Sequence, residues 1–297
     1  YLLGSQVKVT ASPAQPANVY LAGAGNHLVT DNLANVTLSL PATGGWGNAL
    51  LTIDQAATNH GTISLTSWHG SYGAGIAIPS GVLTNAADGL IQAVTGDGNY
   101  RSITGNLTNF GTISAEGGIV LDVYSASATF ALAGGAIAGP GAVAVHDGQT
   151  VYRAGEIPGT LRTYGTQLAI ADSVTATATI YARANNTLVK NASPQVTVAI
   201  EAAGDPGSGN SVLTALPGAY NRGTIALESS HGSYFPTLTT ASGATLRNTP
   251  TGRIVSWATQ GNARTITGSL VNQGTIDATE ITTTFTGTFD SAGGQQV

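Results

Sequence analysis

The segment SITGNLTNFGTISA (102–115) occurs a second time, with small changes, as TITGSLVNQGTIDA (265–278). Other segments match in the same order at nearly the same offset, over most of the 297 residues. Ordered matches of this kind are the signature of a tandem repeat, here of about 162 residues. We therefore predict two domains. Positions 1–161 form a first long repeat, and positions 162–297 form a second repeat that is incomplete at its C-terminus.

A shorter period lies inside the long one, marked by the pattern L-x-N-x-G-T-I. Its asparagines are Asn59, Asn85 and Asn109 in the first copy and Asn221, Asn248 and Asn272 in the second. A short strand followed by a tight corner, repeated every ~24–27 residues, completes one coil of a parallel β-solenoid. We expect an asparagine–glycine corner in each clear coil: Asn59, Gly61, Asn109, Gly111, Asn221, Gly223, Asn272 and Gly274.

The fold class predicted is therefore all-β, a parallel β-helix (β-solenoid) with coils of about 24–27 residues. Runs such as TISL and TIDA alternate apolar and small polar residues, as half-buried strands do. The predicted inward side chains are Ile63, Leu65, Ile91, Val94, Ile113, Ile225, Leu227, Ile254 and Ile276. Two tandem β-sandwiches would explain the long period but not the inner one. The segment 119–180 is less regular, and the sequence leaves open whether it forms further coils or an insertion.

The composition excludes several function classes. Only 8% of the residues are charged, the net charge is −5, and Lys8 and Lys190 are the only lysines. A chain without a basic cluster has little attraction for nucleic acid, and no apolar run is long enough for membrane insertion. Cysteine is absent, which excludes disulfides and thiolate metal sites. Because the chain begins at Tyr1 and contains no methionine, we expect N-terminal sequence to have been removed.

The segments GNLTNFGTI (105–113) and GSLVNQGTI (268–276) resemble the repeats of large bacterial surface proteins, namely filamentous-haemagglutinin-like adhesins and autotransporter passenger domains. The thiol-free, lysine-poor composition rich in Thr, Asn and Gly is similar too. The resemblance covers the corner motif in about six coils. It implies a parallel β-helix outside the cell, in a large modular protein or a filament subunit.

The ionisable residues do not form a recognisable catalytic or metal motif. The fifteen acidic residues are scattered, and the five histidines show no H-x-x-x-H or H-E-x-x-H spacing. We therefore expect no enzymatic activity, no cofactor and no bound metal. Stacked coils can bring distant acids together, so a polysaccharide-degrading site stays open as an alternative.

The segment SWHGSY (67–72) combines a histidine, a tyrosine and a tryptophan, and SHGSY returns at 230–234. As a binding site, Trp68, His69 and Tyr72 with His231 and Tyr234 would form two equivalent carbohydrate-contacting patches, because aromatic faces and hydroxyls suit sugars. As scaffold, the segment is a recurrent turn that leaves the strand, its tyrosine packed on a neighbouring coil. The repetition favours the turn, since a single catalytic centre would not occur twice.

These observations predict an extracellular structural or adhesive rod segment of a bacterial surface protein or filament, located at the cell surface and without catalysis. The alternative is a carbohydrate-binding or polysaccharide-degrading β-helix protein. The expected partners are further copies or neighbouring segments of the same chain, since open solenoid ends pair with strands. A glycan or another host-cell or cell-surface ligand is the other expected partner.

Overall fold

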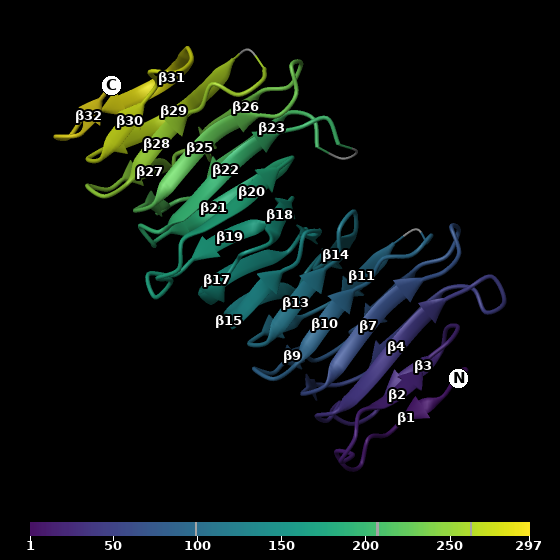
Figure 1. The fold of residues 1–297 in the computed structure, drawn as a ribbon. Helices are drawn as coiled ribbons and strands as arrows, with labels where there is room; N and C mark the ends of the chain where they lie inside the picture. The colour runs from purple at the N-terminus through teal and green to yellow at the C-terminus, as the bar shows by residue number, and fades with distance from the viewer. Residues whose placement is uncertain (99, 206–207, 262) are drawn as a thin grey trace. The chain divides into compact units, whose positions relative to one another are not determined.

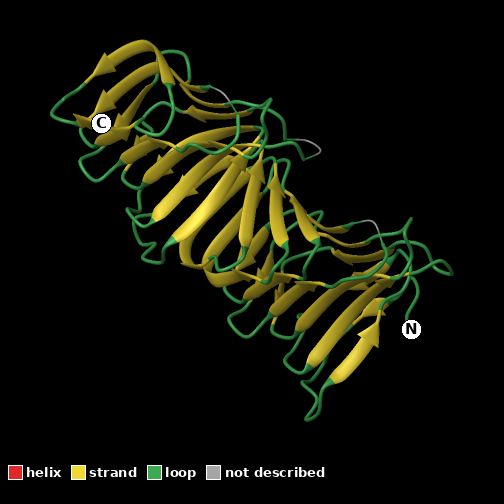
Figure 2. Cartoon of the chain, turned by 45° about the horizontal axis from the view of Figure 1, so that its top comes forward, coloured by secondary structure: helices red, strands yellow, loops and turns green. Residues whose placement is uncertain are grey.

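The computed structural model describes residues 1–98, 100–205, 208–261 and 263–297. Within these ranges the chain is all-β, with parallel strands stacked as a β-solenoid of about 12 turns and no helix (Figure 2). No helix of the described residues therefore has the length and apolar character needed to cross a membrane. The chain divides into two compact units. Unit 1 comprises residues 1–148 and 155–161, and unit 2 comprises residues 149–154 and 162–297.

Unit 1 contains three stacks of parallel strands, and the strands of each stack belong to successive coils (Figure 1). The first stack is β1 (Gln6–Val7), β3 (Asn26–Leu28), β5 (Ala49–Ile53), β8 (Ala74–Ala77), β11 (Arg101–Thr104), β14 (Val120–Tyr124) and β16 (Ala142–His146). The second is β2 (Ala17–Tyr20), β4 (Val36–Ala42), β7 (Thr62–Ser67), β10 (Leu90–Ala93), β13 (Thr112–Ala115) and the end of β15 (Thr129–Ala138). The third is β6 (Ala57–Asn59), β9 (Leu83–Asn85), β12 (Leu107–Asn109) and the start of β15.

Unit 2 repeats this arrangement, and its boundary with unit 1 falls within β17 (Gln149–Glu156) and β18 (Thr160–Tyr164). One stack is β20 (Ala178–Arg183), β22 (Val196–Ala202), β25 (Thr224–Ser229), β28 (Arg253–Ser256), β30 (Thr275–Asp277) and β32 (Gln295–Gln296). A second is β21 (Asn185–Asn191), β23 (Ser211–Ala215), β26 (Pro236–Thr240), β29 (Arg264–Asn272) and β31 (Thr283–Asp290). A third joins β17, β19 (Gln167–Ile170), β21, β24 (Tyr220–Asn221), β27 (Thr245–Asn248) and β29.

The core of each unit consists of aliphatic columns that run across successive coils. Ile63 pairs in register with Ile91, and Ile91 with Ile113, and all three are fully buried. Burying one such side chain is worth roughly 1.5–3 kcal/mol. Each coil therefore gains most of its stability from the coils directly above and below it.

Two of the predicted inward residues are not core residues. Val94 is half-buried, because it lies three positions after the inward Ile91 and strand alternation turns Ala93 inward instead. Ile276 is half-buried because its partner on β32 is Gln296, which supplies no apolar cover.

The segment 119–180 consists of further strands rather than an insertion. Several of its coils are short. Gln149 pairs with Gln167, and Ala178 with Val196, whereas Thr62 in the regular part of the chain pairs with the more distant Leu90. A shorter coil has fewer residues with which to form its corners, and this explains why the N-x-G-T-I corner is missing here.

The corner asparagines form two buried ladders, one in each unit. In unit 1 the Nδ2 of each asparagine donates to the Oδ1 of the next at 2.7–2.8 Å, and in unit 2 at 2.8–3.0 Å. The ladders are Asn32, Asn59, Asn85 and Asn109, then Asn191, Asn221, Asn248 and Asn272, all with no exposed surface. The sequence pattern missed the first member of each ladder because no glycine follows it within four residues, as one does after every other member.

The corner glycines are required by close packing of the main chain. A Cβ at Gly61 or Gly111 would overlap the carbonyl oxygen of the coil below, and the same holds for Gly223 and Gly274. None of these four glycines has a positive φ. The constraint is thus steric approach by a neighbouring coil, not left-handed backbone conformation.

Candidate functional site

The SWHGSY segment of unit 1 is a turn held together by one buried serine. Ser67 ends β7 and is fully buried, and its hydroxyl hydrogen-bonds the carbonyl oxygens of His69 at 3.1 Å and Tyr72 at 2.7 Å. The backbone N–H of Ser71 donates to Nδ1 of His69 at 3.2 Å. The rings of His69 and Tyr72 lie 4.9 Å apart. The turn therefore fixes both side chains beside each other.

Unit 2 contains the same turn with the same hydrogen bonds. The hydroxyl of the fully buried Ser229 reaches the carbonyl oxygens of His231 at 2.7 Å and Tyr234 at 3.1 Å. The backbone N–H of Ser233 donates to Nδ1 of His231 at 3.2 Å, and the two rings are 4.7 Å apart. The repeated sequence thus specifies a repeated local structure.

The hydrogen bond to Nδ1 also fixes the histidine tautomer. A backbone N–H can only donate, so Nδ1 of His69 and of His231 is an acceptor. The proton of the neutral ring is then on Nε2. Both histidines are exposed, so each turn presents an Nε2–H donor beside a half-buried tyrosine.

Each turn packs on a glycine-containing hairpin of the preceding coil. In unit 1, a Cβ at Gly44 would lie 3.0 Å from Cδ2 of His69, and one at Gly47 would lie 3.8 Å from the Tyr72 ring. In unit 2, a Cβ at Gly204 would lie 2.7 Å from Cδ2 of His231. The absence of a side chain at these positions is what lets the histidine and tyrosine rings lie against the hairpin.

The predicted carbohydrate-contact residues form two separate patches. His69 and Tyr72 belong to unit 1, and His231 and Tyr234 belong to unit 2. Trp68 is 53% exposed, and the exposed Ser230 takes its place in the second copy. Each patch offers an aromatic surface together with an imidazole N–H and a tyrosine hydroxyl, which suits weak contact with a sugar.

Unit 2 also carries a partly buried charge cluster on the outward side of β20, β22 and β25. Arg183 is 5% exposed, and its Nε donates to Glu201 at 2.7 Å. Its Nη1 donates to Asp205 and to the hydroxyl of Tyr164. Glu201 pairs in register with Glu228 on the next strand. One guanidinium and two carboxyl groups therefore lie in one row across three coils.

The electrostatics of this row follow from burial. Burial and the negative charge of Glu201 raise the pKa of Glu228 to about 7, against the opposing attraction of Arg264 and Arg183. Burial also opposes the charge of Arg183, but the hydrogen bond and charge of Glu201 outweigh it and raise the Arg183 pKa. Near neutral pH the row thus holds a titrating carboxyl beside an Arg–Glu ion pair.

The first copy has no such cluster at the corresponding place. Aligning VYLA with IYAR, VTLSLPA with VTVAIEA and TISLTS with TIALES puts Ala22, Pro41 and Thr66 where the second copy has Arg183, Glu201 and Glu228. No sequence motif marks the cluster, because its members come from three different coils. The sequence does contain one indication of the cluster, namely that charged residues of the second copy replace uncharged ones at these three matched positions.

Three histidines of unit 1 pair with aspartates of neighbouring coils. The pairs are His27–Asp54 at 2.7 Å, His60–Asp88 at 2.9 Å and His146–Asp122 at 2.8 Å. Over the part of the chain that the structure describes, no three His, Asp or Glu side chains are grouped so as to hold a metal ion. These three histidines therefore each bind an aspartate of another coil.

The chain matches no protein-family model, no curated protein and no solved structure. Its solenoid architecture is consistent with β-helix repeat proteins in general.

Proposed function

We propose that the chain is a structural and adhesive segment of an extracellular bacterial surface protein or filament. Its corner motif resembles the repeats of filamentous-haemagglutinin-like adhesins and autotransporter passenger domains. One observation carries the proposal. The two copies keep the asparagine ladder and the serine-centred turn, whereas exposed positions such as Trp68 and its counterpart Ser230 differ. A constant scaffold with varied surface is what a modular adhesive protein needs.

The proposed role is non-catalytic and needs no cofactor. Several ionisable side chains already have a structural partner, as in the Arg183–Glu201 and Arg253–Asp277 pairs and the three His–Asp pairs. The proposed partners are neighbouring segments or further copies of the chain, and a glycan or other cell-surface ligand. The proposed location is the cell surface.

Antibody labelling of intact cells that produce the chain tests the location. Labelling without permeabilisation is expected, and labelling only after permeabilisation would overturn the proposal. Beads coated with the purified chain test adhesion, and they should be retained on glycan-coated surfaces more strongly than beads coated with an unrelated β-protein. Equal retention of the two kinds of bead would remove the adhesive part.

The second candidate is polysaccharide degradation at Glu201 and Glu228. Paired residues on neighbouring parallel strands lie about 4.8 Å apart at backbone level, which lets the two carboxyl groups reach a similar separation. Carboxyl groups about 5–5.5 Å apart serve as acid and nucleophile in retaining glycosidases. The raised pKa of Glu228 suits the acid role. Release of reducing ends from a polysaccharide panel, lost in Glu228→Gln and Glu201→Gln but not in Glu280→Gln, would support it. No release by the unmodified chain would exclude degradation of the panel's substrates.

A further inference from the structure

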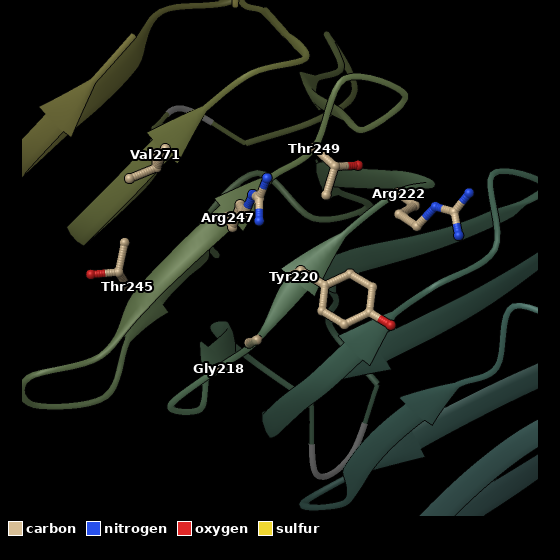
Figure 3. Close-up of a pocket in the computed structure, with 8 residues that line it drawn as sticks. Gly218, Tyr220, Arg222, Thr245, Arg247, Thr249 and Val271 are labelled. Atoms are coloured by element: carbon tan, nitrogen blue, oxygen red, sulfur yellow. The ribbon is translucent and has the colours of Figure 1, made fainter. Parts of the chain in front are cut away.

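Unit 2 has an open groove of about 560 Å³ on the outward side of β24, β27 and β29 (Figure 3). Tyr220 and Arg247 pair in register across its floor, and Arg247 pairs with Val271. Arg222 follows β24 at the corner and lines the same groove. Figure 3 shows the Tyr220 ring between the Arg222 and Arg247 side chains in that view. The groove thus combines one aromatic face with two guanidinium groups.

Both arginines, Arg222 and Arg247, have guanidinium N–H groups that can donate to a ligand. The Arg247 Nε donates to Gln273 at 3.0 Å, which leaves its terminal N–H groups for another acceptor. The Arg222 guanidinium has no hydrogen bond or ion pair to any residue in the described ranges. Both side chains are exposed, whereas Tyr220 is half-buried. The groove is therefore a surface that offers guanidinium donors beside a half-buried aromatic ring.

The first copy lacks this combination. When NHGTISL (59–65) is aligned with NRGTIAL (221–227), His60 stands in place of Arg222, and Thr58 stands in place of Tyr220. His60 is paired with Asp88, whose counterpart in the second copy is the neutral Thr251. The second copy thus carries an arginine and an aromatic ring here, and it has a neutral residue where the first copy has an acid.

The charges around the groove extend this asymmetry. Lys190 precedes Asn191, which pairs with Asn221, so Lys190 lies in the same outward row beside Tyr220. Asp290 pairs with Val271 at the far end of the row, two strands from Arg247. Neighbouring strands are about 4.8 Å apart, so the acid lies roughly 10 Å from the arginine at backbone level. The end of the groove near Tyr220 therefore carries the positive charge.

We infer that this groove binds a carboxylate-bearing sugar unit of an acidic polysaccharide. A guanidinium fork pairs with a carboxylate through two parallel hydrogen bonds, and the face of a tyrosine receives the apolar side of a sugar ring. A phosphate polymer is the weaker fit, because the chain carries a net charge of −5 and strong nucleic-acid binding takes many basic contacts. The inference gives the proposed adhesive function a ligand class and rests on that function for its biological setting.

Calorimetric titration of the purified chain with oligogalacturonate tests the inference. Binding is expected for the oligogalacturonate and not for a neutral galactose oligomer of the same length. Arg222→Gln and Arg247→Gln should each weaken binding about tenfold, the usual scale for a charge-assisted hydrogen bond. Tyr220→Ala should weaken it by a factor of about 5, since such ring contacts are worth on the order of 1 kcal/mol.

Matched variants separate the groove from general charge. Arg153→Gln makes the same charge change at an exposed position outside the groove and should leave binding unchanged. Arg247→Lys keeps the charge but removes the fork, and should weaken binding. Equal loss in Arg153→Gln, equal binding of the neutral oligomer, or tighter binding of single-stranded DNA than of oligogalacturonate would each overturn the inference. Because the titration uses the purified chain, a failure here is distinguishable from failure of surface labelling or bead adhesion.

Discussion

Replacing Asn85 by alanine tests whether the asparagine ladder holds the coils of unit 1 together. The Nδ2 of Asn85 donates to the carbonyl oxygen of Gly89 at 3.2 Å, to Oδ1 of Asn109 at 2.7 Å and to the carbonyl oxygen of Thr112 at 3.1 Å. Its own Oδ1 accepts from Asn59 at 2.7 Å. Asn85→Ala therefore removes four hydrogen bonds of the buried ladder.

The magnitude follows from what is left unpaired. An unsatisfied buried polar group costs about 1–3 kcal/mol, and Oδ1 of Asn109 loses its only donor among the described residues. We expect Asn85→Ala to lower the free energy of unfolding by about 3 kcal/mol, roughly a hundredfold in the folding equilibrium. Asn32→Ala should cost less, because it also removes an Oδ1 that is buried without a partner in the native ladder. The exposed Asn18→Ala should cost almost nothing.

Urea denaturation followed by far-ultraviolet circular dichroism measures these differences. Because stacked repeats need not unfold in one step, exchange of the Phe110 and Gly111 amides, which both donate to the Asn85 carbonyl oxygen, gives a local reading. These two amides should exchange faster in Asn85→Ala than in Asn18→Ala. The reasoning fails if Asn85→Ala stays within about 0.5 kcal/mol of the native chain. It also fails if Asn32→Ala is the more damaging change.

Three further predictions concern the turns and the charge cluster. Ser229→Ala should free the turn around His231 at a cost of about 1–2 kcal/mol, seen as faster exchange of the Tyr234 amide, while the exposed Ser233→Ala should not. Gly204→Ala should displace the His231 ring and change its NMR shifts, whereas Gly45→Ala meets no atom within 4 Å and should leave the corresponding ring unmoved. Glu228 has a folded-state pKa of about 7, raised by burial above the ordinary 4.5, so the unfolded chain loses this proton first and stability should fall as pH rises from 4.5 to 7. Glu228→Gln should remove that part of the slope in urea titrations at pH 5 and 7.5; an unchanged slope would show that the carboxyl does not titrate in this window.

The candidate site was only partly accessible from the sequence. The repeated HGSY motif was visible, and its repetition indicated a turn, but nothing in the motif itself points to Ser67 and Ser229 as its hydrogen-bonding centres. The groove of Tyr220 and Arg247 was invisible because these residues belong to different coils and follow no motif. Only the register of adjacent coils brings them together.

The sequence by itself determined the architecture, because a solenoid coil is a local unit. Strand alternation, a corner glycine and a corner asparagine every ~24–27 residues specify one coil. The same pattern of residues then recurs in the next coil. The tertiary structure alone decided which outward side chains meet. Coil lengths vary, since Ala178 pairs with the nearby Val196 whereas Thr62 pairs with the more distant Leu90. Register therefore cannot be counted along the chain, because each pairing depends on how the intervening corner folds. This is why Glu201 with Glu228, and Tyr220 with Arg247, appeared as sites only once the coils were stacked.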